Sequence, residues 1–490
     1  MQPTFRSQLF IYGEYVHSAS GKTFPVVNPA NNEVLTELAE AGVEDVNRAV
    51  AAARKAFDEG PWPRLKTAER ARMLRHFAEL LVKHAPELEQ IESLDVGKPV
   101  KESGGHDIPR AANNFSFFAD ALSQWTQDAH WSESTSLGVD VNLLSVTMRQ
   151  PLGVAGIIIP WNSPMMLGTW KLAPCLATGC TAVLKPSEWA PLSLMKLGEI
   201  AQEAGLPPGV LNVIAGFGDV GAAVVSHPDV NAVSFTGGVP TGKRVMKAAA
   251  DTLKRISLEL GGKSPNIIFA DADLDLAVKG AVRAIFRSQG QSCVAGSRLL
   301  LQDAIYDRFM ERFLSAVANL KVGDPLDPTT DFGPLITAQH RERVEGFIEA
   351  GLSEGARLLI GGKRPTDPAL QKGNYLLPTV FEGVTSSMRI CQEEIFGPVL
   401  AVQRFHDEAE AIRLANSTIY GLAGFLWTQD VNRALRVSSA VKTGMMWVNS
   451  FFLRDLRTPF GGARESGVGR EGGRYSLEFY TEPKFVCIPY

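Results

Sequence analysis

From residue 154 onward, short apolar runs alternate with segments of helical length, and this alternation constrains the fold more than any other feature of the chain. The apolar runs span residues 154–159, 181–184, 210–215 and 230–235, and the segments between and after them span 164–178, 190–204, 219–226 and 240–250. Short apolar runs are typical of buried parallel strands, and each longer segment can supply the crossover helix to the next strand. The pattern predicts βαβ units and an α/β fold with a parallel sheet.

The alternation resumes further along the chain. Strand-like segments at 266–269 and 299–302 flank an apolar helix through Val282 and Phe286, which predicts a second α/β domain. Two surface helices, over residues 44–58 and 67–85, are expected to begin the chain. The segments 139–143 and 479–486 alternate polar and apolar residues, so we expect exposed strands that pair within or between subunits.

Composition excludes several classes of function. With 490 residues, 45% of them apolar, the chain can bury large cores in about three structural units. The net charge of −4 comes from 49 basic and 53 acidic residues spread through the sequence, which argues against binding nucleic acid or an anionic membrane. No apolar run is long enough to cross a bilayer, and the N-terminal segment Met1–Arg6 has no leader pattern. Five cysteines without a CxxC pair argue against disulfides and against a metal site, so we expect a cytoplasmic protein.

One cysteine lies in a segment suited to chemistry. Cys293 is surrounded by small residues in the stretch 290–298, and Glu259 precedes it in the segment Glu-Leu-Gly-Gly-Lys-Ser-Pro, residues 259–265. A cysteine among small residues is open to a substrate, and a nearby carboxylate can activate a thiol or a water molecule. The alternative is a buried cysteine that acts only as a small apolar side chain.

Two glycine-rich loops indicate a nucleotide. Residues 216–221 fit the GxGxxG pattern after a predicted strand, although no acidic residue follows about twenty positions later to bind a ribose. Residues 237–243 resemble a P-loop, but Arg244 occupies the position of the magnesium-binding Ser or Thr, so phosphoryl transfer is disfavoured. A glycine turn that presents a helix N-terminus to a pyrophosphate is one interpretation of this loop, and a tight turn without a ligand is the other.

Seven motifs occur together in this chain: Pro160-Trp161-Asn162, Lys185-Pro186-Ser187-Glu188, Phe235-Thr236-Gly237, Glu259 to Lys263, Gly290 to Cys293, Glu393 to Pro398 and Pro459 to Gly462. In this order and spacing they resemble the NAD(P)-dependent aldehyde dehydrogenase superfamily, from about residue 10 to the C-terminus. The resemblance implies a Rossmann-like NAD-binding domain formed by residues 1–131 and 151–262, and a catalytic domain formed by residues 263–473. It also implies oligomerisation strands at 132–150 and 474–490 that join subunits into dimers or tetramers.

The resemblance also assigns roles. Cys293 is implied as the nucleophile, Asn162 and the backbone N–H of Cys293 as oxyanion donors, and Glu259 as the base that activates water. A carboxylate at the adenosine ribose repels a 2′-phosphate, so Glu188 favours NAD over NADP as the cofactor. The implied cofactor-binding residues are Ile158, Pro160, Trp161, Lys185, Ser187, Glu188, Gly218, Phe235, Gly237, Gly238, Gly242, Leu260, Glu394 and Phe396.

Substrate choice depends on arginines. Arg110 and Arg454 fall, by motif offset, where many members of the superfamily have apolar pocket residues, and Trp170 and Phe460 are expected beside them. These segments are similar to those of the muconic-semialdehyde dehydrogenases, which act on 2-aminomuconate, 2-hydroxymuconate or 5-carboxymethyl-2-hydroxymuconate semialdehyde. Guanidinium groups suit a carboxylated substrate. Arg287 also falls near Cys293, but Arg287 and Arg457 are equally expected to pair with surface carboxylates.

The function predicted from the sequence is therefore the NAD-dependent oxidation of a carboxylate-bearing, muconic-type semialdehyde of aromatic catabolism to an acid, through a cysteine thiohemiacetal and thioester. One alternative is the same reaction on a neutral aliphatic, aromatic or betaine-type aldehyde. The other is a nucleotide-binding protein that retains the scaffold without turnover.

Overall fold

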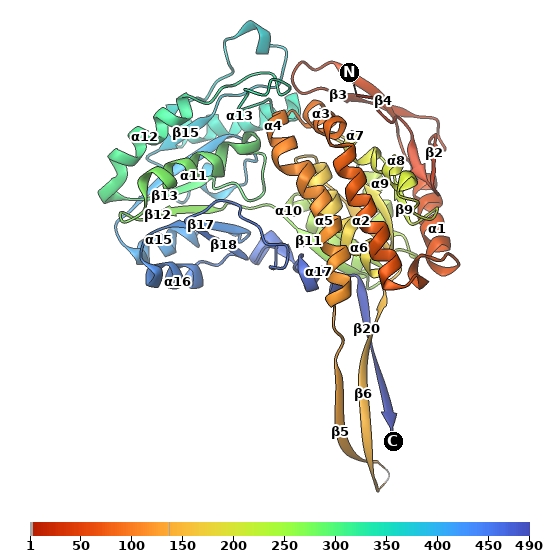
Figure 1. Cartoon of the computed structure of the whole chain (residues 1–490). Helices are drawn as coiled ribbons and strands as arrows, with labels where there is room; N and C mark the ends of the chain where they lie inside the picture. Colours follow the sequence, from red (N-terminus) through yellow and green to blue (C-terminus); the bar gives the residue numbers. More distant parts are fainter. Residues whose placement is uncertain (1–2, 137) are drawn as a thin grey trace.

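The computed structural model describes residues 3–136 and 138–490, which form two large sheets, a hairpin and a three-stranded sheet (Figure 1). Met1 and Gln2, in the segment where no leader is expected, and Leu137, in the predicted strand segment 132–150, lie outside the described residues. The two large sheets lie side by side, and the three-stranded sheet projects from the body of the molecule as an arm (Figure 1). This arrangement confirms the α/β fold.

The first large sheet has the strand order β19-β11-β10-β7-β8-β9-β1-β2. Its five central strands run parallel, as the alternating pattern predicts. They are β7 (Val154–Ile158), β8 (Thr181–Lys185), β9 (Leu211–Val213), β10 (Ala232–Thr236) and β11 (Arg255–Glu259). The crossover helices are α6 (Pro164–Thr178), α7 (Leu192–Met195), α8 (Leu197–Glu203), α9 (Gly218–Ser226) and α10 (Val239–Ala250). Strand order reverses at β7, so the sheet has its topological switch point there, where ligands bind in folds of this type.

The start of the chain differs from the prediction of two leading helices. Four strands come first: β1 (Leu9–Ile11), β2 (Glu14–Val16), β3 (Thr23–Val27) and β4 (Val34–Ala39). The expected helices follow as α1 (Val43–Asp58) and α2 (Thr67–Lys83). Such short strands do not show a clear alternation of polar and apolar residues. β1 joins the rest of the sheet through the pairing of Phe10 with Val213 on β9, which is distant in sequence.

Helices α3 (Ala85–Val96), α4 (Val100–Glu102) and α5 (Ile108–Gln124) follow α2, with a π-helical turn at Ser103–Asp107 between α4 and α5. Helices α2, α5 and α6 pack together over this sheet (Figure 1). The largest apolar core lies between these helices and the sheet, and includes Phe77, Phe115 and Phe118. Burial of these aromatic side chains holds the helical layer on the sheet.

The second large sheet confirms the second α/β unit. Its order is β14 (Arg357–Ile360), β15 (Thr379–Glu382), β16 (Val399–Phe405), β13 (Arg298–Gln302), β12 (Pro265–Ile268), β17 (Ala423–Trp427) and β18 (Met445–Val448), parallel except for β14. The helices of this half are α11 (Leu274–Phe286), α12 (Tyr306–Ala318), α13 (Ala338–Ser353), α14 (Arg389–Gln392), α15 (Glu408–Ala415) and α16 (Val431–Ala440). Strand β19 (Gly467–Val468) returns to pair with β11, which ties the two halves together.

The arm consists of β5 (Ala129–Ser136), β6 (Val139–Pro151) and β20 (Thr481–Pro489), all antiparallel. The strands that contain the two alternating segments, β6 and β20, pair within one chain, from Thr481 opposite Pro151 to Pro489 opposite Leu143. Residues 139–143 themselves lie opposite 132–136 of β5. Helix α17 (Gly473–Phe479) precedes β20, so the last strand starts later than residue 474. The arm leaves large apolar side chains in solvent, and Trp131 and Phe485 are 68% and 67% exposed.

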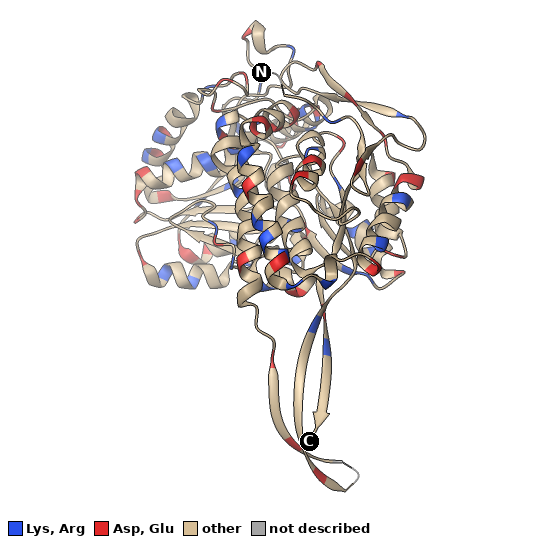
Figure 2. Ribbon diagram, turned by 45° about the vertical axis from the view of Figure 1, so that its right-hand side comes forward, with Lys and Arg blue, Asp and Glu red and all other residues tan. Residues whose placement is uncertain are grey.

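Charged residues of both signs are intermixed over the helices of the body, as Figure 2 shows. No helix among the described residues has the length and apolar character needed to cross a membrane.

Candidate active site

Asn162, Glu259 and Cys293 lie in the region where the two large sheets meet. Glu259 is the last residue of β11, Asn162 follows β7, and Cys293 lies in the loop between α11 and β13. Asn162 Nδ2 donates a hydrogen bond to the carbonyl oxygen of Gln291, 3.0 Å away, and this fixes the amide against the cysteine loop. Gly262 contacts the same loop: a Cβ at this position would lie 2.6 Å from the carbonyl oxygen of Cys293, so only glycine permits this packing.

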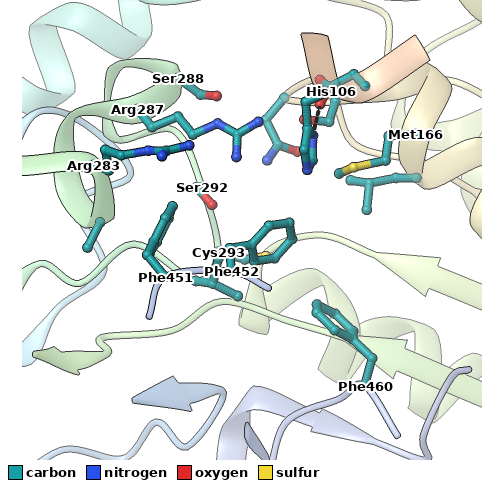
Figure 3. Close-up of a pocket in the computed structure, with 16 residues that line it drawn as sticks. His106, Met166, Arg283, Arg287, Ser288, Ser292, Cys293, Phe451, Phe452 and Phe460 are labelled. Carbon is teal, nitrogen blue, oxygen red and sulfur yellow. Dashed lines mark hydrogen bonds and ion pairs between the residues drawn. The ribbon is translucent and has the colours of Figure 1, made fainter. Parts of the chain in front are cut away.

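The Cys293 side chain opens into a cavity of about 580 Å³ (Figure 3). Figure 3 shows Arg283 and Arg287 reaching into the cavity from one side, with His106 and Met166 next to them and three phenylalanines on the side of Cys293. The wall also includes Asn162, Ser292 and Asp107, and its main apolar residues are Met166, Leu167, Val294, Phe451, Phe452 and Phe460. The site therefore combines an apolar surface with cationic groups.

The environment of Cys293 keeps its thiol protonated. Burial, followed by the negative charges of Glu394 and Glu259, raises the pKa of Cys293 to about 12. A nearby carboxylate opposes formation of a thiolate because like charges repel. Without a bound ligand, the sulfur is therefore a neutral thiol at neutral pH.

Glu259 is buried, and neither of its carboxylate oxygens has a hydrogen-bond partner among the described residues. Burial, followed by the charge of Glu471, raises the pKa of Glu259 well above its usual range. Glu471 itself is held by Lys171, whose Nζ lies 2.5 Å from Glu471 Oε1 and 3.0 Å from Ser234 Oγ. A buried carboxyl group with a raised pKa is suited to accept a proton from water.

A second cavity, of about 1260 Å³, lies at the carboxyl ends of β7, β8 and β10. Its lining includes Thr236, whose Oγ1 is buried and has no partner among the described residues. Helix α10 begins beside it at Val239, after Gly238 as N-cap. The predicted cofactor residues in its walls are Ile158, Pro160, Trp161, Lys185, Ser187, Glu188, Gly218, Phe235, Gly237 and Gly238.

The other four predicted cofactor residues lie outside the walls of that cavity. Glu394 Oε1 accepts a hydrogen bond from the backbone N–H of Gly262 at 3.0 Å, and burial raises the pKa of Glu394 to about 7. The ring of Phe396 packs edge-on against Trp161, with centroids 5.2 Å apart. Gly242 permits close packing of Leu260, since an added Cβ would lie 2.5 Å from the Leu260 side chain.

Arg110 and Arg454 come together over one aromatic ring. Their guanidinium carbons lie 5.4 and 4.9 Å from the centre of the Trp170 ring, and Arg454 also lies 4.8 Å from the centre of the Phe460 ring. Burial lowers the pKa of each arginine to about 10. Neither pairs with a carboxylate within the described part of the chain, and Arg454 Nη2 is buried without a partner there. Phe460 is the residue that links this pair to the Cys293 cavity.

Trp170 and the two arginines are not in the wall of the Cys293 cavity, whereas Arg287 is. Arg287 lies 3.6 Å from Glu102, and the exposed Arg457 forms an ion pair with Asp455 at 2.6 Å. Arg287 and Arg457 therefore each pair with a carboxylate, as the alternative interpretation of these two residues predicts.

The sequence reasoning did not identify several residues of the site. Arg283 lies one helical turn before Arg287, and this spacing was the available signal. His106 Nδ1 lies 2.7 Å from Asp107 Oδ1, and Asp107 forms a buried ion pair with Lys98, which donates to Ser163 Oγ at 2.7 Å. Lys98, His106, Asp107, Lys171 and Glu471 carry no local pattern, because only the folded chain brings them together. In the part of the chain that the structure describes, no cluster of three or more His, Cys, Asp or Glu residues suits a metal ion.

Comparison with known proteins bears directly on this site. Residues 15–486 match the aldehyde dehydrogenase family. The chain is 46% identical to a 2-hydroxymuconic semialdehyde dehydrogenase from Pseudomonas sp. (strain CF600), covering 98% of each chain. It is 48% identical to a 5-carboxymethyl-2-hydroxymuconate semialdehyde dehydrogenase from Escherichia coli, covering 94% of this chain and 96% of the other. A crystal structure of betaine aldehyde dehydrogenase from Staphylococcus aureus with NAD+ is similar, with a TM-score of 0.94, 41% identity and coverage of 99% of this chain and 94% of the other.

Proposed function

The chain belongs to the aldehyde dehydrogenase family, and on that premise we propose that it uses NAD to oxidise a carboxylate-bearing, muconic-type semialdehyde of aromatic catabolism to the corresponding acid. The observation that carries the substrate class is the pair Arg110 and Arg454, which lie together, half-buried, over Trp170 without a carboxylate partner among the described residues. Two adjacent guanidinium groups repel each other, and a substrate carboxylate relieves this repulsion while accepting their hydrogen bonds.

The reaction begins at Cys293. The thiol of Cys293 first releases its proton to solvent. The resulting thiolate attacks the aldehyde carbon, so that an S–C bond forms while the C=O π pair moves to oxygen, which gives the oxyanion of a thiohemiacetal. The amide of Asn162 and the backbone N–H of Cys293 donate to this oxygen where its charge develops. Asn162 is already held against the cysteine loop through Gln291, so little reorganisation is needed.

Glu259 acts in the second half of the reaction. Once the substrate has become a thioester on Cys293, Glu259 accepts a proton from a water molecule, whose oxygen attacks the acyl carbon. The S–C bond then breaks, the carboxylic acid leaves and the sulfur is regenerated. The unpartnered oxygens of Glu259 leave it free to bind that water.

The 1260 Å³ cavity fits NAD in its hydrogen-bond donors. Thr236 Oγ1 offers an unused buried hydroxyl, and the N-terminus of α10 provides free amides for a pyrophosphate. Lys185 and Glu188, whose charged atoms lie 3.7 Å apart, would hold the adenosine ribose. Glu394 would hold the second ribose with Phe396 beside it. When bound, NAD supplies the hydride acceptor that turns the thiohemiacetal into a thioester.

The subunit divides, in this proposal, into an NAD-binding domain (1–131 and 151–262), a catalytic domain (263–473) and an oligomerisation arm from the segments 132–150 and 474–490, in the second of which the strand begins at Thr481. The exposed apolar side chains of the arm support its use as a contact between copies in a homodimer or homotetramer. Five cysteines without a disulfide support a cytoplasmic location.

The test of the function is the initial rate of NADH formation with 2-hydroxymuconate semialdehyde, compared with hexanal and benzaldehyde, each with NAD and with NADP. We expect kcat/KM to favour the carboxylated aldehyde about a hundredfold, and NAD over NADP. The Cys293→Ala variant should lose oxidation but keep NAD binding, and the matched Cys487→Ala variant should keep both. Turnover by Cys293→Ala would exclude the covalent mechanism.

A second candidate is oxidation of a neutral or betaine-type aldehyde, which the likeness to the Staphylococcus aureus enzyme favours. It predicts equal or better kcat/KM for the uncharged aldehydes, so the same measurement separates the two substrate classes.

A further inference from the structure

A second pair of arginines, Arg283 and Arg287, lies at the mouth of the Cys293 cavity. Together with His106, they line both this cavity and an adjoining outer cleft, so these three residues mark the passage between the two spaces. Arg283 belongs to α11 and Arg287 follows its last residue, so the two are one helical turn apart and extend in the same direction (Figure 3). The pair is separate from Arg110 and Arg454, which lie over Trp170.

The N–H groups of both guanidinium groups are available as hydrogen-bond donors. Arg283 forms no ion pair with any described residue, and Arg287 has only Glu102, at 3.6 Å. The oxygens of Glu102 already accept hydrogen bonds from the backbone N–H of Ser288 at 3.3 Å and from Ser288 Oγ at 2.8 Å. Neither arginine side chain donates a hydrogen bond to another described residue. An anion at the mouth would therefore find unused donors.

Asp107 is the carboxylate in the wall of the Cys293 cavity, and Asp331 lines the outer cleft together with Glu102. Asp331 forms an ion pair with Lys101 at 2.5 Å. Asp107 is buried, forms an ion pair with Lys98 and contacts His106. Its charge is offset within the protein, so it does not neutralise the two arginines. Cationic charge with free donors thus remains at the mouth, on the same cavity as the nucleophile.

We propose that Arg283 and Arg287 form a second anion subsite, which binds a carboxylate other than the one assigned to Arg110 and Arg454. The substrate class then narrows to an aldehyde that carries two carboxylates. This inference rests on the proposed function, because it takes the aldehyde to react at Cys293. Guanidinium groups bind carboxylates through paired N–H donors, which fixes the orientation of the substrate as well as its charge.

The first experiment needs neither aldehyde nor NAD. Iodoacetate and iodoacetamide both alkylate a thiolate, forming an S–CH₂ bond and releasing iodide, but only iodoacetate is an anion. The rate of alkylation of Cys293 by each reagent is followed by peptide mass spectrometry. We expect the rate with iodoacetate divided by the rate with iodoacetamide to fall about tenfold in the double variant Arg283→Met, Arg287→Met. The double variant Arg283→Lys, Arg287→Lys keeps the charge and should keep most of the ratio.

A matched control lies on the same helix. Lys279 is exposed on α11, one turn before Arg283 and outside both cavities. Lys279→Met removes a positive charge without touching the mouth, so its alkylation ratio should equal that of the unaltered protein. If the ratio of alkylation rates falls equally in Lys279→Met, or does not fall in the arginine double variant, the proposed anion subsite is wrong.

The second experiment tests the substrate class. 5-Carboxymethyl-2-hydroxymuconate semialdehyde has one carboxylate more than 2-hydroxymuconate semialdehyde. We expect the methionine double variant to lose about tenfold or more in kcat/KM on the first compound and little on the second. An equal loss on both compounds overturns the assignment to a second carboxylate. If the alkylation ratio falls while unaltered protein prefers hexanal, the anion subsite stands and the proposed function fails.

Discussion

Arg110 and Arg454 lie over the same indole ring, that of Trp170, with their guanidinium carbons 5.4 and 4.9 Å from its centre. The charge of Arg454 contributes to lowering the pKa of Arg110, after burial, and no described carboxylate separates the two. Two cations held this close are costly unless an anion joins them. This relationship is the basis for the proposed preference for a carboxylated aldehyde over a neutral one.

Replacing both arginines tests that relationship. The double variant Arg110→Met, Arg454→Met keeps apolar stems against Trp170 and removes both charges. We expect about a hundredfold loss of kcat/KM on a carboxylated semialdehyde and little change on hexanal, because only the former loses charged hydrogen bonds. Arg457→Met is the matched control, since Arg457 is exposed and paired with Asp455. Equal losses on both aldehydes would show that the pair is structural.

The Glu259→Gln variant should separate the two halves of the reaction. We expect a stoichiometric burst of NADH followed by a rate that is lower by about 10² to 10⁴, because the thioester forms but its water is not activated. Mass spectrometry should find the acyl group on Cys293. The matched control is Glu465→Gln, an exposed carboxylate paired with Lys243.

Thermal denaturation provides an independent check on Glu259→Gln. Burying an unpartnered carboxylate is more costly than burying a neutral amide, so the variant should be at least as stable as the unaltered protein. A large fall in Tm would mean that the lost activity reflects unfolding rather than a missing base.

The reactivity of Cys293 should depend on pH in a distinctive way. The alkylation rate of a free thiol rises with pH and levels off above its pKa of about 8.5, where it is fully ionised. With the pKa of Cys293 raised to about 12, alkylation by iodoacetamide in the enzyme without NAD should continue to rise beyond that point. Glu394 is the larger of the two electrostatic contributors, so Glu394→Gln should lower this pKa and speed alkylation at any fixed pH. A plateau near the free-thiol value would contradict the burial of the sulfur.

Removing the carboxylate of Glu188 should change the preference of the enzyme between NAD and NADP. Glu188 lines the 1260 Å³ cavity next to Lys185, and Glu188→Gln removes the charge that repels a 2′-phosphate. We expect kcat/KM for NADP to rise about tenfold relative to NAD. Asp251→Asn, at the end of α10 opposite the cavity, is the matched control and should leave the ratio unchanged. An unchanged ratio in Glu188→Gln would remove Glu188 from cofactor selection.

Local patterns were enough to predict the α/β fold and to single out the segments that carry Glu259 and Cys293, whereas Asn162 was identified through the family resemblance. Asn162 follows the buried strand β7 and Glu259 ends β11, and the carboxyl ends of parallel strands meet at one edge of a sheet. Patterns of this kind were not available for the first four strands, because β1 and β2 are only three residues long and β1 joins its sheet through a distant partner.

The residues at the cationic mouth of the cavity could not be predicted from the sequence. His106 lies in the π-helical turn at Ser103–Asp107, which breaks the 3.6-residue period, so its face could not be deduced from spacing. Arg283 lies on a helix whose pattern mainly records its buried side. Which of four arginines faces the thiol depends on how the two halves of the chain pack, and no single segment encodes that.

The arm also has a consequence for biosynthesis. Strand β20 is the last element of the chain, yet it pairs with β6 along its whole length, and the backbone N–H of Tyr490 donates to the carbonyl of Asn142 at 3.0 Å. Until β20 has been synthesised and has left the ribosome, the hairpin of β5 and β6 has one edge unpaired, a state in which strands join wrong partners. Completion of the arm, and any contact between subunits that needs it, therefore has to follow synthesis of β20, which comes after every strand of the two large sheets.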